Sequence, residues 1–133
     1  MCILICRCVL GLLPTYYLYM KRKALKEVGV DYTAGVLHFA GKEELYVKYL
    51  RKYGEDHHLQ DAVAAYEKTD YKEVLDQIYA LKGLSGTLGF SRMFQSASAV
   101  VSDLRKEEYQ MIGEQLKQMQ LYQKKLIVAI KTI

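Results

Sequence analysis

The side chains with the most obvious chemical potential gather in one predicted helix, from Asp70 to about Leu84. Tyr79 is rotated by about 100° around this helix from the preceding Ile78, so we expect its ring to point to solvent. Apolar residues recur at steps of three and four, which gives the helix one buried face; they are Val74, Leu75, Ile78, Leu81 and Leu84. The exposed stripe around Tyr79 contains Lys72, Asp76, Lys82, Gly83 and Gly86.

This stripe offers a phenol, a carboxylate and an ammonium group. A tyrosine hydroxyl has a pKa of about 10, so it is protonated at neutral pH and would need a nearby base to act as a nucleophile. Asp76 lies one turn before Tyr79, but the simpler role for its carboxylate is solvation or an ion pair with Lys72 or Lys82. No base for Tyr79 is evident, and the sequence therefore predicts no catalytic residue at this position.

The glycines of the stripe are costly for a helix. An exposed glycine in a helix loses about 1 kcal/mol relative to alanine. Gly83 and Gly86, each about one turn from a projecting ring and a lysine, therefore suggest that another surface approaches closely. In the alternative interpretation, Gly86 and Gly89 mark the frayed end and the C-cap of the helix, which leaves Gly83 unexplained.

The run from Tyr79 to Gly89, YALKGLSGTLG, resembles the central motif of histidine-containing phosphotransfer (HPt) domains of two-component signalling. That motif has His-x-Leu-Lys-Gly, then small polar residues and a glycine before the next helix. Tyr79 stands where the family has its phosphorylated histidine. The positions that match in type and spacing are Lys82, Gly83, Ser85, Gly86 and Gly89.

A second segment extends the resemblance towards the N-terminus. Gly41–Leu50, GKEELYVKYL, is similar to the segment that opens the second helix of HPt domains. Together the two motifs make the resemblance cover about residues 30–130. It implies a module that binds the receiver domain of a response regulator or of a hybrid histidine kinase.

The tyrosine changes the chemistry that the resemblance implies. An imidazole nitrogen can accept a phosphoryl group and pass it on, because it is a neutral nucleophile near neutral pH and phosphohistidine is itself a high-energy species. A phosphotyrosine ester would be too stable for onward transfer. We therefore expect a pseudo-phosphotransfer module in the cytoplasm, without enzymatic activity, cofactor or metal. The expected docking residues are Tyr79, Lys82, Gly83, Ser85, Gly86 and Asp76, with Arg92 and Gln95 from the outer side of the following helix.

Two alternatives from other functional classes remain open. The first is an active phosphotransfer protein that uses an unrecognised acceptor. The second is a helical structural adaptor whose partner is not a receiver domain.

The three histidines, His38, His57 and His58, are expected to be surface, turn or cap residues, because none lies in a motif that resembles the acceptor site.

The charge distribution argues against nucleic-acid binding. The net charge is +4, but five of the 19 basic residues lie in residues 1–26, which contain no acid. The remaining 14 basic residues face 15 acidic ones, so the body of the chain is close to neutral. A nucleic-acid footprint needs basic residues along a whole face.

The N-terminal segment, residues 1–26, is apolar and then basic. Its uncharged run, Cys8–Met20, is shorter than the roughly 20 residues that a spanning helix needs. An extra helix packed on the body, a marginal membrane anchor through residues 1–20 and a non-functional translated leader all remain open, with the packed or loosely ordered segment favoured. An anchor would keep the body on the cytoplasmic face because basic residues follow it.

All three cysteines lie in this same segment, at Cys2, Cys6 and Cys8. The body of the chain needs no disulfides, which fits a reducing cytoplasm. A soft-metal site would lack a nearby fourth ligand, so we expect these cysteines to be incidental small apolar residues.

The fold is predicted to be all-α. At 133 residues the chain is long enough for one domain with a core of its own. A short helix capped by Asp31 or Thr33 should carry Val36, Leu37 and Phe39 inward and end at Gly41. Longer helices are expected at Lys42–Tyr53, continuing as a separate or bent helix through Tyr66, at Asp70–Leu84, from a Ser91 cap through a buried stripe that includes Phe94, and at Lys106–Lys131. Residues 27–133 should therefore form an antiparallel up-and-down four-helix bundle with one or two extra short N-terminal helices.

Overall fold

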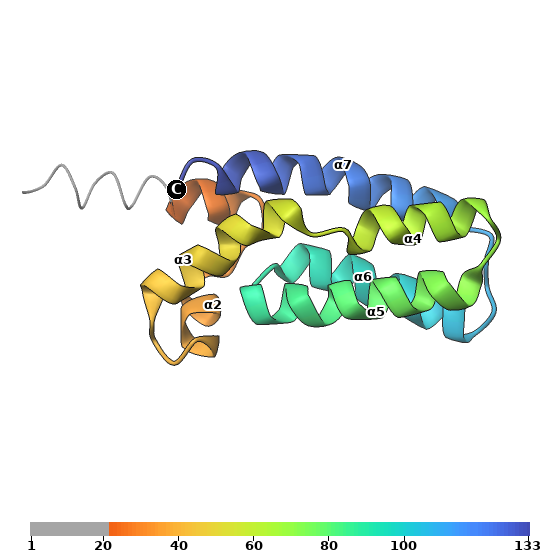
Figure 1. Cartoon of the computed structure of the whole chain (residues 1–133), viewed down its shortest axis with the longest axis horizontal. Helices are drawn as coiled ribbons and strands as arrows, with labels where there is room; N and C mark the ends of the chain where they lie inside the picture. Colours follow the sequence, from red (N-terminus) through yellow and green to blue (C-terminus); the bar gives the residue numbers. More distant parts are fainter. Residues whose placement is uncertain (1–21) are drawn as a thin grey trace, which may run out of the picture.

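The computed structural model describes residues 22–133, and these residues fold as an all-α unit (Figure 1). Residues 22–27 are helical. The elements that follow are α2 (Tyr32–His38), α3 (Glu43–Lys52), a 3-10 turn (Tyr53–Glu55), α4 (His58–Glu67), α5 (Tyr71–Leu88), α6 (Ser91–Arg105) and α7 (Ile112–Ile130). The expectations for residues 1–21, including the apolar run and the three cysteines, lie outside the described residues.

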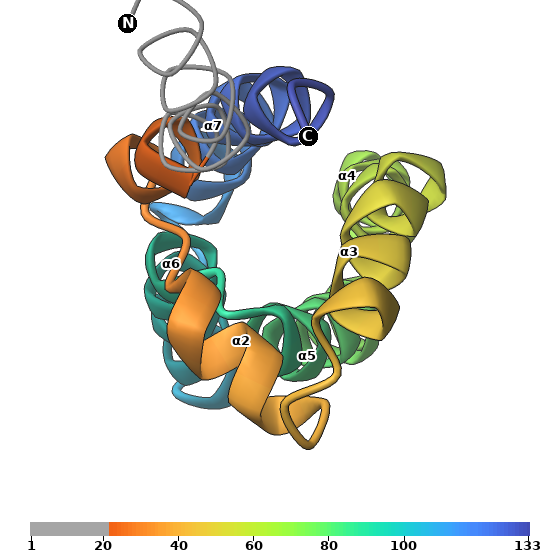
Figure 2. The same cartoon turned by 90° about the vertical axis from the view of Figure 1, so that its left-hand side faces the viewer.

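The four C-terminal helices, α4 to α7, surround a common core. α4 packs against α5, α5 against α6, and α6 against α7, while α7 also contacts α4. Viewed along the long axis, α5 and α7 lie on opposite sides of the molecule, and α2 crosses the end of α5 and α6 (Figure 2). The helix at residues 22–27 lies beside α7, where the Tyr122 hydroxyl donates a hydrogen bond to the Val28 carbonyl.

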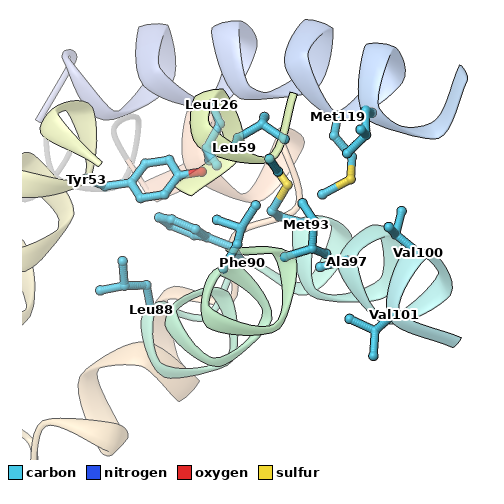
Figure 3. Packing of buried hydrophobic residues seen from close by; sticks show 14 of the residues in the cluster. Tyr53, Leu59, Leu88, Phe90, Met93, Ala97, Val100, Val101, Met119 and Leu126 are labelled. Atoms are coloured by element: carbon cyan, nitrogen blue, oxygen red, sulfur yellow. The ribbon is translucent and has the colours of Figure 1, made fainter. Parts of the chain in front are cut away.

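The interior is filled by aliphatic, methionine and aromatic side chains, among them residues of α4, α5, α6 and α7 (Figure 3). The Tyr53 ring meets the Phe90 ring edge-on at 4.8 Å between centroids, and Gln123 donates to the Tyr53 hydroxyl at 3.1 Å. Leu25 is fully buried in the same core. Part of the helix at residues 22–27 therefore packs against the same core as the rest of the described chain.

Helix caps follow the sequence in part. The Asp31 carboxylate accepts a hydrogen bond from the Ala34 amide and caps α2, and Asp70 does the same for the Glu73 amide of α5. Gly89 ends α5 in the left-handed conformation, at φ +78°, as a C-cap requires. Ser91 is not the cap of α6: the cap position is Phe90, and Ser91 is the first helical residue.

Two helix boundaries differ from the prediction. α5 continues to Leu88, because Leu81, Ser85 and Leu88 extend its buried face past the glycines. α6 and α7 are separated by a turn in which Glu107 has φ +56°, so α7 starts at Ile112 rather than Lys106. The 19 residues of α7 span about 28 Å.

Several predicted core positions are exposed. Leu37 has 68% of its surface accessible and Phe94 has 38%, and Leu45 and Tyr49 of α3 are also exposed. Since α2 has only seven residues and buries Gly35, Leu37 falls on the far side of this helix. α3 and α4 are two helices joined by the 3-10 turn.

Among the helices of residues 22–133, none combines enough length with enough apolar character to cross a lipid bilayer.

His58 is half-buried rather than fully solvated, with its Nδ1 2.6 Å from the Asp56 carboxylate. His57 is exposed at the start of α4, as expected.

Candidate functional site

Tyr79 lies on the outer surface of α5, and 56% of its surface is accessible. The expectation that its ring points away from the core is therefore confirmed. The ring has a neighbour from the next helix, because the Arg105 guanidinium at the end of α6 lies 5.5 Å from the ring centroid. This cation–π contact fixes a positive charge next to the phenol.

A second cation–aromatic pair lies further along the same two helices. The Lys82 ammonium is 5.5 Å from the centroid of the Phe94 ring of α6. That ring also covers Gly86, where an added Cβ would lie 3.4 Å from the Phe94 Cδ2 atom. The exposed Phe94 is therefore part of this surface, at the α5–α6 boundary, and not part of the core.

Gly83 lies between these two pairs, in the interior of α5. It is exposed, and a Cβ built on it would have no atom within 4 Å among its surroundings. No internal contact requires a glycine here, and the helix loses stability by having one. The open backbone at Gly83 thus has no structural reason within the described residues.

The stripe ends at a recess between α2, α5 and α6 with a volume of about 420 Å³. Gly86 and Gln95 line it, together with Phe94 and with His38 of α2. The His38 Nδ1 atom is 3.0 Å from the Thr87 carbonyl oxygen. In the tautomer with the ring proton on Nδ1, this N–H donates a hydrogen bond to the Thr87 carbonyl. Nε2 is then the unprotonated nitrogen of the exposed imidazole.

Ser85 was expected at the docking surface, and this expectation is wrong. Its side chain is fully buried, because it continues the apolar face of α5 defined by Ile78 and Leu81. Within the described part of the chain its hydroxyl has no hydrogen-bond partner, although the residue borders the recess. A partner that touches the surface of α5 would not reach this hydroxyl.

Arg92 also lies away from Tyr79. Its guanidinium packs over the Tyr122 ring of α7 at 5.3 Å, next to Gly29. Arg92 and Phe94 are separated by about 200° around α6, so Arg92 faces α7 while Phe94 faces α5. Arg92, which was expected on the docking surface, therefore does not lie on it.

Asp76 is exposed on α5, one turn before Tyr79. Among residues 22–133, the ion pair that is formed joins Arg22 to Glu43, so of the two roles expected for Asp76, an ion pair with Lys72 or Lys82 is absent and solvation remains. The Asp76 carboxylate is a solvated charge at the edge of the stripe.

We call the resulting area the α5–α6 face; it consists of Tyr79, Lys82, Gly83, Gly86, Phe94 and Arg105, with Gln95 and His38 at the recess. Sequence reasoning missed Arg105, Phe94 and His38. Arg105 lies 26 positions from Tyr79 and no motif links the two residues, so only the packing of α6 on α5 reveals the pair. Between residues 22 and 133, no three His, Cys, Asp or Glu side chains gather as a metal site would require.

Comparison with known proteins adds no relative to this picture. No family model, curated protein or solved structure gives a significant match to the chain.

Proposed function

We propose that this protein is a pseudo-phosphotransfer module of cytoplasmic two-component signalling, which docks receiver domains through the α5–α6 face. In this proposal α4, α5, α6 and α7 correspond to an antiparallel up-and-down four-helix bundle of the HPt type. The observation that carries the proposal is that Tyr79, at the position that resembles the HPt acceptor, is exposed to solvent beside the open backbone of Gly83 and two cations.

The charges suit the chemistry of a receiver domain. The acceptor residue of an HPt domain enters an acidic pocket on its partner. Lys82 and Arg105 would face that pocket with positive charge, and Gly83 would permit close backbone approach. Complementary charge at an interface favours encounter and register.

The Tyr79 ring would fill the mouth of the receiver's pocket without accepting phosphate. Among residues 22–133 no base forms a hydrogen bond with the Tyr79 hydroxyl, and the phosphate ester of Tyr79 could not pass its phosphoryl group to another aspartate. The protein would then sequester a response regulator or compete with a true phosphotransfer protein for it.

Substitution of Gly83 tests the docking face. Gly83→Arg places a long side chain in open space at the centre of the face, so the fold should survive and receiver binding should weaken at least about tenfold, equivalent to 1.4 kcal/mol. Gly54→Arg is the matched control, since Gly54 is also exposed and has no atom within 4 Å of an added Cβ. Titration of each variant with purified receivers, followed by calorimetry, measures the difference. Equal affinity of the two variants would contradict the proposal.

A second candidate function rests on His38. Its exposed imidazole is oriented by the Thr87 carbonyl and lies at the end of the α5–α6 face, beside the recess. In an active phosphotransfer protein, the imidazole Nε2 would attack the phosphorus of an aspartyl phosphate, and the aspartate carboxylate would leave. Incubation with a phosphorylated receiver distinguishes the two functions. Transfer of label to the wild-type chain, abolished in His38→Ala, would favour this candidate over the pseudo-phosphotransfer module.

A further inference from the structure

The outer face of α7 combines basic, amide and apolar side chains. Its exposed residues follow one stripe along the helix, within about 60° of Leu121 on either side. They are Glu114, Lys117, Gln118, Leu121, Lys124, Lys125 and Val128. Beyond Glu114, no acidic residue occurs as far as the last residue of the chain.

The two apolar members of this stripe are well exposed. Leu121 has 48% of its surface accessible and Val128 has 65%. They lie seven residues apart, at two-turn spacing, and Lys124 and Lys125 flank the line between them. An apolar line bordered by lysines is the pattern of a helix that lies in the interface of a lipid bilayer.

More basic side chains come from the opposite end of the described chain. The helix at residues 22–27 lies beside α7 (Figure 2), with Arg22, Lys23 and Lys26 exposed on it. The Arg22 guanidinium is already paired with the Glu43 carboxylate at 2.7 Å, and Glu27 adds one acid. The surplus positive charge of the area thus comes mainly from lysines.

We propose that this surface, the outer stripe of α7 with the neighbouring helix 22–27, binds the surface of an anionic phospholipid bilayer. Negative headgroups attract each nearby lysine or arginine, and the two apolar side chains insert at the acyl boundary.

The composition favours lipid over nucleic acid. Proteins that bind nucleic acids add arginine and stacking aromatic side chains to a basic surface. The α7 stripe contains neither, and instead exposes Leu121 and Val128. In Figure 2, α7 lies on the opposite side of the molecule from α5, which carries Tyr79. The inference does not depend on the proposed docking of receivers.

Vesicle flotation with the full chain tests the proposal. Vesicles of phosphatidylcholine are compared with vesicles that also contain phosphatidylserine, at low and high salt. The wild type should bind the anionic vesicles more strongly, with a preference that salt reduces. Lys124→Gln with Lys125→Gln should lower binding to anionic vesicles about twenty-five-fold, since two basic contacts of about fivefold each are lost.

The control removes two exposed lysines elsewhere, by Lys48→Gln with Lys68→Gln on α3 and at the end of α4. This variant should bind anionic vesicles like the wild type. Leu121→Ser with Val128→Ser should also weaken vesicle binding. The proposal is overturned if the Lys124 and Lys125 variant keeps wild-type binding, if neutral and anionic vesicles bind equally, or if the chain binds RNA in preference to anionic vesicles.

Discussion

The Arg105 guanidinium lies 5.5 Å from the centroid of the Tyr79 ring, across the contact between α6 and α5. The position that resembles the HPt acceptor therefore has a fixed positive charge beside it. A neighbouring cation disfavours protonation of an imidazole. A histidine placed at this position would thus be held in its neutral, nucleophilic form.

This relationship predicts the result of Tyr79→His. The variant should accept label from a phosphorylated receiver, because the exposed position gains a neutral nitrogen nucleophile while Lys82 and Gly83 stay in place. Phosphotransfer assays with the receiver and the variant measure this gain. Tyr79→Phe is the control and should remain unlabelled. A Tyr79→His variant that binds the receiver but takes no label would show that the face is not built like an HPt acceptor site.

Gly83→Ala should stabilise the protein by about 1 kcal/mol. The added methyl group has no atom within 4 Å, and alanine is the better helix former. Urea denaturation of the variant and the wild type gives the difference in the free energy of unfolding. Destabilisation instead would mean that Gly83 makes a structural contribution that its open surroundings do not explain.

Gly35→Ala should have the opposite effect. A Cβ at Gly35 would lie 2.4 Å from two atoms of the Tyr46 ring, which is fully buried and donates from its hydroxyl to the Leu88 carbonyl at 2.6 Å. The ring cannot move without breaking this bond, so we expect a loss of about 1–3 kcal/mol, typical of overpacking. The same denaturation experiment measures it, with Gly54→Ala as the exposed control. If Gly35→Ala leaves the free energy of unfolding unchanged, α2 packs less tightly against α3 than the structure shows.

Alkaline pH should destabilise the fold through its buried tyrosines. Burial raises the pKa of Tyr53 to about 12, and burial together with the Glu43 hydrogen bond raises the pKa of Tyr32 to about 12. Burial also raises the pKa of Tyr46. A raised folded-state pKa gives stabilisation that is complete below the unfolded-state pKa of about 10 and is lost as the pH rises through the folded-state value.

The free energy of unfolding should therefore decrease between about pH 10 and pH 12. Urea titrations across this range measure the decrease, and tyrosinate absorbance reports ionisation in the same samples. Tyr53→Phe should make the decrease smaller. Tyrosine ionisation in that range without loss of stability would contradict the assignment.

Acidic pH should weaken the contact of α3 with the N-terminal helix. Glu43 accepts hydrogen bonds from the Tyr32 hydroxyl and the Arg22 guanidinium, both at 2.7 Å, and these bonds lower the pKa of its carboxyl. The stabilisation is therefore present above the unfolded-state pKa and is lost as the pH falls through the lower folded-state value. Since both partners are about half exposed, Glu43→Gln should cost only about 0.5–1 kcal/mol at neutral pH. The difference between variant and wild type should vanish in acid, as urea denaturation at the two pH values would show.

Local sequence determined much of the helical structure. The spacing of Val74, Ile78 and Leu81 defined the buried face of α5 and therefore the outward direction of Tyr79. Asp31, Asp70 and Gly89 predicted their caps, because a cap depends on a side chain and a few neighbouring backbone groups. Period and capping act within one or two turns, which is the range that a sequence pattern can describe.

Tertiary packing decided the composition of the α5–α6 face. Ser85 and Phe94 exchanged their expected places, Ser85 inside and Phe94 outside, because the contact between α5 and α6 selects which flank of each helix is covered. The same contact brings Arg105 to Tyr79 and turns Arg92 towards Tyr122. A helix periodicity gives the direction of a side chain around its own axis, but the angle at which a second helix lies against it depends on all the side chains between them. For that reason Tyr79 and its neighbours on α5 were predictable, whereas Phe94 and Arg105 of α6 and His38 of α2 were not.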